Sequence, residues 1–191
     1  SLQRGEEDSF LKIKDKNANL IFEHDRVDKG VFSYNSKYAI FVVKEWNDTI
    51  TEMKRRKVKK GKMPMDSLGI FNLQNKTLVK ISNIKSYENP EKWSGYLAYT
   101  YDSTNKHKKD TIKEKKINKK PSSKNGYPLI IRNLDTEKED TIPFVLDYTF
   151  SKKEKFISYV TSGEKNSTKP GVYIKDLSNN IAKHIYESHV K

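Results

Sequence analysis

A short pattern that occurs three times constrains the fold of this chain more than any other feature. The stretches Leu68–Leu73, Leu129–Leu134 and Val172–Leu177 align without gaps as Leu-Gly-Ile-Phe-Asn-Leu, Leu-Ile-Ile-Arg-Asn-Leu and Val-Tyr-Ile-Lys-Asp-Leu. Each copy has an aliphatic residue first, Ile third, Asn or Asp fifth and Leu last. An internal repeat of this kind indicates a fold built from repeated supersecondary units.

A second pattern precedes the first along the chain. Phe32–Val42 aligns without a gap on Phe150–Val160, and Trp93–Tyr101 is a shortened copy. Short apolar segments separated by polar turns predict four antiparallel strands in each unit, which is typical of a propeller blade. The predicted fold class is therefore all-β, a β-propeller fragment of about three four-stranded antiparallel blades plus part of another.

The domain boundaries follow from this repeat. Residues 1–9 are polar and are expected to form a disordered or tag-like N-terminus, while residues 10–191 form the partial propeller. The expected blade units are 10–26, which is partial and has two strands around an Asp-Lys-Asn turn, then 27–83, 84–144 and 145–191. Closed propellers usually have about four to eight blades, so we expect a fragment that self-associates through its open strand edges.

The amino-acid composition limits the classes of partner and of structure that this chain can have. Lys and Arg number 38 against 25 Asp and Glu, which gives a net charge of +13. Only five of these cations are Arg, so the charge predicts a diffuse Lys field, and no specific nucleic-acid recognition is expected. The chain has no Cys, which excludes disulfides and Cys-ligated zinc. It also has no run of 18 apolar residues, so no membrane span is predicted.

Two Lys-rich segments, 54–62 and 106–120, fall in the long connection between the second and third strands of successive units. Equivalent connections should emerge on one face of a propeller, side by side. One interpretation is two solvated, partly disordered loops, and the other is a basic rim that docks a partner or steers acidic ligands. The candidate rim residues are Lys54, Arg55, Arg56, Lys57, Lys59, Lys60, Lys108, Lys109, Lys115 and Lys116.

Motifs for chemistry are absent from the sequence. There is no Gly-x-Ser-x-Gly, no Gly-x-Gly-x-x-Gly and no phosphate loop. The four His residues share no metal-ligand spacing, so no catalytic residue, metal or cofactor is predicted. The acidic run Asp135–Asp140 is interpreted as a solvated turn. Asn72, Asn133 and Asp176 share one repeat position, where a side chain that binds its local backbone would shape the next turn.

Several stretches of the first unit resemble a known family. Trp46, the 54–62 run, Met63–Leu73 and Ile81–Trp93 together are similar to the N-terminal propeller of bacterial prolyl oligopeptidase family (S9) serine peptidases, above all the larger exported forms of Bacteroidetes-like organisms. The likeness covers about Val27 to Leu177 and is most specific at Asp-Ser-Leu-Gly-Ile.

The resemblance implies a parent protein in which the propeller is covalently attached to a C-terminal α/β-hydrolase domain that carries Ser, Asp and His. It further implies that the propeller restricts entry to small or unfolded peptides and contacts peptide substrate. No family catalytic residue matches a position of this chain, so the chain alone is expected to be inactive. A periplasmic or otherwise exported location is expected, and a cytoplasmic one stays open.

A second function remains open beside the peptidase. A propeller is also the scaffold of TolB-like and WD40-like proteins, which bind other proteins and carry out no chemistry, and the fold does not distinguish these functions.

Overall fold

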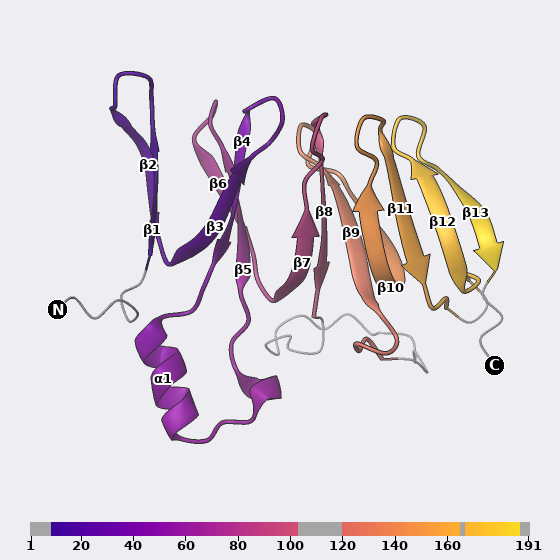
Figure 1. The fold of residues 1–191 in the computed structure, drawn as a ribbon, viewed down its shortest axis with the longest axis horizontal. Helices are drawn as coiled ribbons and strands as arrows, with labels where there is room; N and C mark the ends of the chain where they lie inside the picture. The colour runs from indigo at the N-terminus through magenta and orange to yellow at the C-terminus, as the bar shows by residue number, and fades with distance from the viewer. Residues whose placement is uncertain (1–8, 103–119, 165–166, 188–191) are drawn as a thin grey trace. The chain divides into compact units, whose positions relative to one another are not determined.

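The computed structural model describes residues 9–102, 120–164 and 167–187. Apart from Ser9, the N-terminal segment 1–9 therefore lies outside the described residues. The chain divides into two compact units, residues 1–84 and 85–191. The elements, labelled in Figure 1, are β1 (Phe10–Lys14), β2 (Leu20–Asp25), β3 (Val27–Phe32), β4 (Tyr38–Val43), α1 (Asn47–Arg55), a 3-10 turn (Lys60–Lys62), β5 (Ser67–Asn72), β6 (Thr77–Ile81), β7 (Ile84–Glu88), β8 (Tyr96–Tyr101), β9 (Tyr127–Asn133), β10 (Glu139–Phe150), β11 (Phe156–Thr161), β12 (Gly171–Asp176) and β13 (Ile181–Glu187).

Unit 1 consists of a hairpin and a sheet. Strands β1 and β2 pair antiparallel, and β3, β4, β5 and β6 form a four-stranded sheet in chain order. The hairpin packs on one face of this sheet through a single apolar cluster. Its buried members are Ile13, Val27, Ala39, Phe41, Val43 and Phe71, with Leu11, Ile21, Phe22 and Leu73 packed against them.

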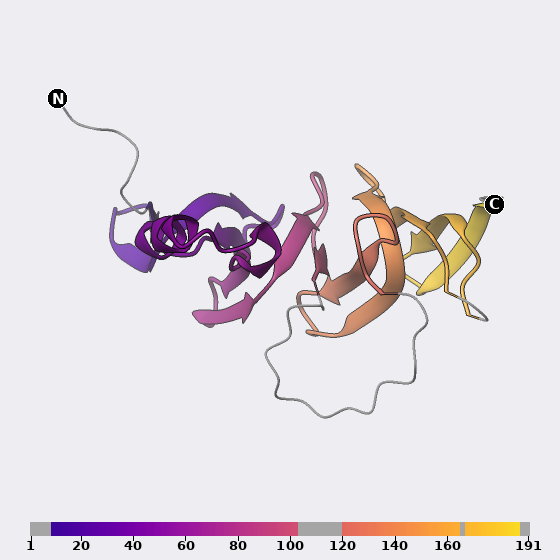
Figure 2. The same cartoon turned by 90° about the horizontal axis from the view of Figure 1, so that it is seen from below.

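Unit 2 is one seven-stranded antiparallel sheet that runs in order from β7 to β13. The sequence predicted a closing strand and a new entering strand here, but β10 serves both purposes. It pairs with β9 through Glu139–Ile142 and Val145, and with β11 through Val145–Phe150. Between these halves, Pro143 has no N–H to donate and Phe144 has a left-handed backbone with φ of 53°, so the strand changes partner without ending. Figure 2 shows the resulting bend in β10.

The register of the strands confirms the repeat that was read from the sequence. In each group the first residue of the second strand pairs with the repeat Asn or Asp at the end of the third strand. These pairs are Tyr38 with Asn72, Tyr96 with Asn133, and Phe156 with Asp176. The all-β fold class of four-stranded antiparallel blades is thereby confirmed, and β1–β2 has the place of a closing hairpin.

The repeat Leu has a backbone role that explains its position. Its N–H donates a 2.9 Å hydrogen bond to the carbonyl oxygen of the residue just before the second strand. The donors are Leu73, Leu134 and Leu177, and their acceptors are Lys37, Gly95 and Lys155. Each bond ties the end of one strand to the beginning of its neighbour, so the four-stranded group closes at that end.

Candidate functional site

The first Lys-rich segment begins on a helix. Helix α1 projects beyond the ends of β4 and β5 (Figure 1) and is followed by the 3-10 turn at Lys60–Lys62. The interpretation of the 54–62 segment as a partly disordered loop is therefore wrong for Lys54 and Arg55, which lie in the last turn of this helix. Asp48 in the first turn and Lys54 and Arg55 in the last turn suit the helix dipole. No helix in the described part of the chain is long and apolar enough to cross a membrane.

The six basic rim residues on this segment that the structure describes, which are Lys54, Arg55, Arg56, Lys57, Lys59 and Lys60, are all exposed. Glu52 on α1 pairs with Arg55 at 3.5 Å and with Arg56 at 2.7 Å. The lysines therefore carry the unpaired charge of this surface. The remaining rim residues, Lys108, Lys109, Lys115 and Lys116, lie outside the described residues, so a rim built from both segments stays a prediction.

The residues that lead into α1 are fixed by charge. The Arg26 guanidinium lies 4.4 Å from the Trp46 ring centroid and pairs with Glu45 at 3.4 Å. The Lys44 ammonium lies 2.7 Å from the Asp66 carboxylate, and this hydrogen bond raises the pKa of Lys44. Lys44 follows β4 and Asp66 precedes β5, so the ion pair joins the two strands at the base of the helical excursion.

Neither described histidine is placed for nucleophilic catalysis. His24 lies among aromatic rings, 5.5 Å from the ring centroid of Phe41, with Nδ1 2.6 Å from the carbonyl oxygen of Asp25. His184 stacks on Tyr173 at 4.4 Å. Neither ring hydrogen-bonds to a serine among the described residues. Within the described residues no cluster of three metal-ligating side chains occurs. The prediction of a chain without catalytic or metal-binding groups stays a prediction.

A groove of about 380 Å³ lies in unit 2, beside the turns that join β9 to β10 and β12 to β13. Its lining combines apolar, amide and charged side chains. These are Tyr96, Ile131, Asn133, Thr136, Lys138, Glu139, Asp140, Lys175, Leu177 and Asn180. The Tyr96 hydroxyl donates to the Leu177 carbonyl oxygen at 2.9 Å and fixes the groove wall.

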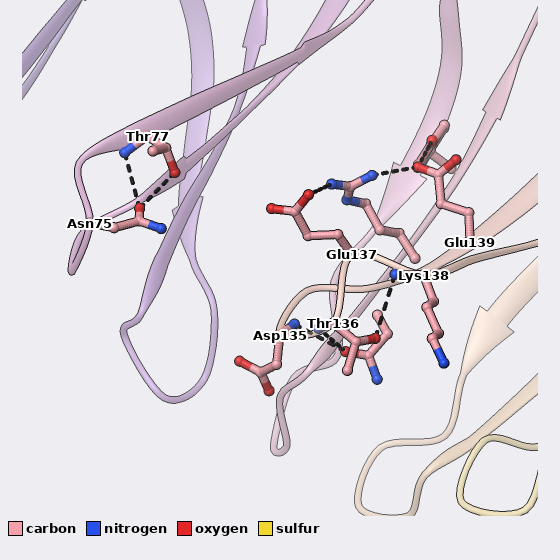
Figure 3. Close-up of polar contacts among 10 residues, drawn as sticks. Asn75, Thr77, Asp135, Thr136, Glu137, Lys138 and Glu139 are labelled. Atoms are coloured by element: carbon pink, nitrogen blue, oxygen red, sulfur yellow. Dashed lines mark hydrogen bonds and ion pairs between the residues drawn. The ribbon is translucent and has the colours of Figure 1, made fainter.

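An ion pair lies in this groove. The Lys175 side chain, only 8% exposed, pairs with the Asp140 carboxylate. Arg132 pairs with Glu139 at 2.7 Å and with Glu137 at 3.5 Å, and Figure 3 shows both contacts. The interpretation of Asp135–Asp140 as a solvated turn is therefore wrong for its last two residues, which begin β10 and bind cations.

The groove can accept a small polar or mixed ligand. Its volume is at the lower end of the range of ligand pockets. Lys138 and Asn180 are exposed and can donate to a carboxylate or a peptide carbonyl, and Ile131 and Leu177 supply apolar contact. The charge of Lys175 is already balanced by Asp140, so this lysine is engaged within the groove.

The turns that follow the repeat Asn and Asp confirm the role that was predicted for these side chains. Asn133 Oδ1 accepts the N–H groups of Asp135 and Thr136 at 3.0 Å each. Asn72 Oδ1 accepts from Gln74 and Asn75, and Asp176 Oδ1 accepts from Ser178. In Figure 3, Asn75 in turn accepts from Thr77.

Asp15 in the β1–β2 turn is a fourth member of this set that the sequence comparison missed. Its Oδ1 accepts the N–H groups of Asn17 and Asn19 at 2.8 Å each. The signal was present, because Ile13-Lys-Asp15 repeats the letters of Ile174-Lys-Asp176. The hairpin β1–β2 is therefore equivalent to β12–β13 in the repeat.

The matched register and turns define this chain as an all-β repeat protein of the propeller-blade class. No protein-family model matches it, and no curated protein matches it. Among solved structures it is similar to the β-propeller domain of the Trilobed protease from Pyrococcus furiosus, with a TM-score of 0.46 and 12% identity over 85% of this chain and 42% of that one.

Two further structures are similar at a lower level. Acylaminoacyl peptidase from Pyrococcus horikoshii matches with a TM-score of 0.44 and 10% identity, covering 95% of this chain and 28% of that one. A protein from Lactobacillus plantarum matches with a TM-score of 0.36 and 10% identity, covering 95% of this chain and 49% of that one. The chain thus spans less than half the length of each of these proteins.

Proposed function

We propose that this chain is the non-catalytic propeller part of a larger serine peptidase of the prolyl oligopeptidase family, where it restricts substrate entry or contacts the peptide. The observation that carries the proposal is that the most specific stretch of the sequence resemblance, Asp66–Ile70, coincides with a defining element of the first blade. Most of it is β5, the third strand, which pairs with β4 along its whole length. Asp66 itself holds Lys44 at the base of α1.

The second stretch of the resemblance, Ile81–Trp93, also has a defined structural role. It contains β7, and its last residue, Trp93, is buried in unit 2. The Trp93 indole N–H donates to the Ser151 carbonyl oxygen at 2.8 Å, and its ring meets Phe150 edge-on at 5.3 Å. These two stretches of the resemblance therefore contribute strands and core contacts to the blades.

Peptide contact is assigned to the groove of unit 2. Exposed Lys138 and Asn180 beside apolar Ile131 and Leu177 suit a short peptide, whose backbone carbonyls need donors and whose side chains need apolar contact. The attached α/β-hydrolase domain, the exported location and the gating role are parts of the same proposal.

The reading frame beyond Lys191 provides the first test. The proposal expects Gly-x-Ser-x-Gly followed in order by an acid and a His. A frame that instead adds only further blades would reject the peptidase and favour a TolB-like or WD40-like binding scaffold.

The second test uses the parent protein and this chain side by side. A fluorophosphonate probe should label the parent and leave the 191-residue chain unlabelled, since the nucleophile is expected outside it. Gating predicts that the parent cleaves short peptides and spares a folded protein that contains the same cleavage sequence. Lys138→Ala with Asn180→Ala should raise the KM for short peptides, whereas the exposed turn variant Lys153→Ala should not. Equal cleavage of folded and short substrates would contradict gating.

A further inference from the structure

One face of the last three strands is apolar and exposed. Paired residues in neighbouring antiparallel strands point to the same side of a sheet. Ser158, Ile174 and Lys183 pair in one row, and Val160, Val172 and Tyr186 pair in the next. These six residues are called the outer face of β11–β13. Ile174 is 39% exposed and Tyr186 is 65% exposed, although aliphatic and aromatic side chains in a sheet usually face a core.

The equivalent face of β8–β10 shows what covers such a surface. The corresponding rows there are Ala98, Ile131 and Asp140, and Thr100, Leu129 and Ile142. Ala98 and Leu129 are fully buried and Ile131 is 3% exposed. They share one core cluster with Ile157 and Tyr159 of β11. The chain itself therefore covers this face with another antiparallel sheet of the same repeat.

An ion pair joins the covered face to the covering sheet. Asp140 lies on the covered face, and it pairs with Lys175, the residue just before the turn Asp of the covering sheet. The equivalent contact in unit 1 joins Phe22 and Phe71, whose ring centroids lie 4.0 Å apart. Both junctions place complementary side chains at this position, either opposite charges or two aromatic rings.

On the outer face of β11–β13, Lys183 occupies the position that Asp140 has on the face of β8–β10. Lys183 pairs with Ile174 in the ladder as Asp140 pairs with Ile131. Lys183 is exposed, and no ion pair is seen for it within the part of the chain that the structure describes. A complementary sheet would present a carboxylate to Lys183, in the place from which Lys175 meets Asp140.

A second copy of the chain does not fit this requirement. In a second copy, the sheet face available for such a contact is the face of the β1–β2 hairpin that points away from Phe41. The residue there that corresponds to Lys175 is Lys14, because each immediately precedes the turn Asp of its Ile-Lys-Asp sequence. Lys14 is exposed. Stacking two copies face to face would bring Lys14 against Lys183, and like charges across a contact disfavour it.

We infer that the outer face of β11–β13 docks a further blade-type β-sheet that carries Asp or Glu directly before its third-strand turn residue, and that Lys183 selects against a second copy of this chain. The apolar rows supply the buried area and the ammonium supplies the selectivity. This inference is independent of the peptidase proposal, because it rests only on the repeat and its charges.

A charge-reversal cycle on the full 191-residue chain tests the inference. Lys14→Glu turns the chain's own hairpin into a stand-in for the proposed partner. Lys14→Glu alone, and Lys183→Glu alone, should each promote head-to-tail association, because each pairs opposite charges. The double variant should associate no more strongly than the natural chain, because it again brings like charges together. Sedimentation equilibrium at low salt measures the association constants. Both sites are exposed, so circular dichroism should confirm unchanged folding.

The expected gain is about tenfold or more in association constant for each single variant, and it should decline with added salt. Lys153→Glu, an exposed turn residue outside both faces, is the matched control and should give no gain. The inference is overturned if the single variants associate no more than the natural chain, or if the double variant associates as strongly as they do.

Discussion

Phe71 in unit 1 and Lys175 in unit 2 occupy the same position of the repeat, one residue before the turn Asn or Asp. Each contacts the neighbouring hairpin, but the type of interaction differs. Phe71 stacks on Phe22 with ring centroids 4.0 Å apart and planes 20° apart. Lys175 pairs with Asp140. Phe22 and Asp140 are themselves equivalent, because each lies opposite an Ile in its hairpin, Ile13 and Ile131.

The comparison shows that the backbone register is conserved while the contact between sheets is free to change, provided that both partners change together. Stacked rings gain free energy from burial and dispersion. A partly buried ion pair gains little net free energy, because desolvation of the charges offsets their attraction. The aromatic junction should therefore stabilise the fold more, and the charged junction should impose a stronger requirement on its partner.

Phe71→Ala should have the largest effect on stability. Phe71 is 2% exposed, so the change removes a ring from the unit 1 cluster and leaves a cavity against Phe22. The expected loss of unfolding free energy is about 3–5 kcal/mol. Urea unfolding followed by circular dichroism measures it. Phe10→Ala is the matched control, because Phe10 is 63% exposed. Equal losses for the two variants would show that the stack contributes nothing beyond surface contact.

Asp140→Ala should cause the next largest loss of unfolding free energy, and this loss should exceed that of Lys175→Met. Removing Asp140 leaves a nearly buried ammonium unpaired, whereas removing Lys175 leaves a carboxylate that is 43% exposed and can hydrate. That exposure reduces the usual cost of a broken buried pair, so Asp140→Ala should cost about 1–3 kcal/mol.

The double variant Asp140→Leu with Lys175→Met sharpens the comparison, because it converts the charged junction into an apolar one. Its unfolding free energy should lie close to that of the natural chain. Lys169→Ala serves as the control, since its pair with Glu187 lies on the surface. If the double variant unfolds as easily as Asp140→Ala, the charged junction is a stabilising feature and the comparison fails.

Much of the fold could be predicted because the turns require particular residue types at fixed positions of the sequence. The Asn or Asp and the Leu of each repeat carry local backbone bonds, so their types are restricted and their spacing is visible. Apolar alternation around them gave the strands. The continuity of β10 was missed, since Pro143 normally interrupts a ladder, and only the change of partner strand at Phe144 accommodates it.

Other features depend on contacts that local patterns do not encode. Helix α1 has only two apolar residues, Ile50 and Met53, and neither is fully buried, so the apolar stripe that identifies a helix is too short to recognise in the sequence. Lys175 and Asp140 are 35 residues apart in the sequence, so no local pattern links them. Asp140 also ends an acidic run, which favours the interpretation of a solvated turn. One clue was available, because Lys175 stands at the position of Phe71 in an otherwise apolar strand. The groove that the pair helps to line could not be inferred without this pairing.

A smaller loss of unfolding free energy is expected in alkaline solution. It arises in unit 2, which contains the three tyrosines concerned. Burial raises the pKa of Tyr159 to about 12, and it also raises the pKa of Tyr99 and Tyr148. The unfolded chain ionises near pH 10, so it releases protons first and stability declines as the pH rises from about 10 to 12. Tyr159→Phe should remove about 1–2 kcal/mol of that decline. Unfolding free energies at pH 9 and pH 11.5 measure the difference, and an equal decline in both proteins would contradict it.

The smallest effect tests the equivalence of the hairpin β1–β2 to the other repeats. Hydrogen bonds from the Asn19 side chain and backbone lower the pKa of Asp15, so the turn gains its stabilisation above the unfolded value near 3.8 and loses it as the pH falls through the folded value. The Asn17 and Asn19 amide protons should then shift together in an NMR titration below pH 4. In Asp15→Asn the two shifts should disappear and the hairpin should persist, because Asn72 and Asn133 accept the bond from the residue two positions on without a charge. If Asp15→Asn instead releases the hairpin from unit 1, the charge of Asp15 is essential and the equivalence of the four turns does not hold.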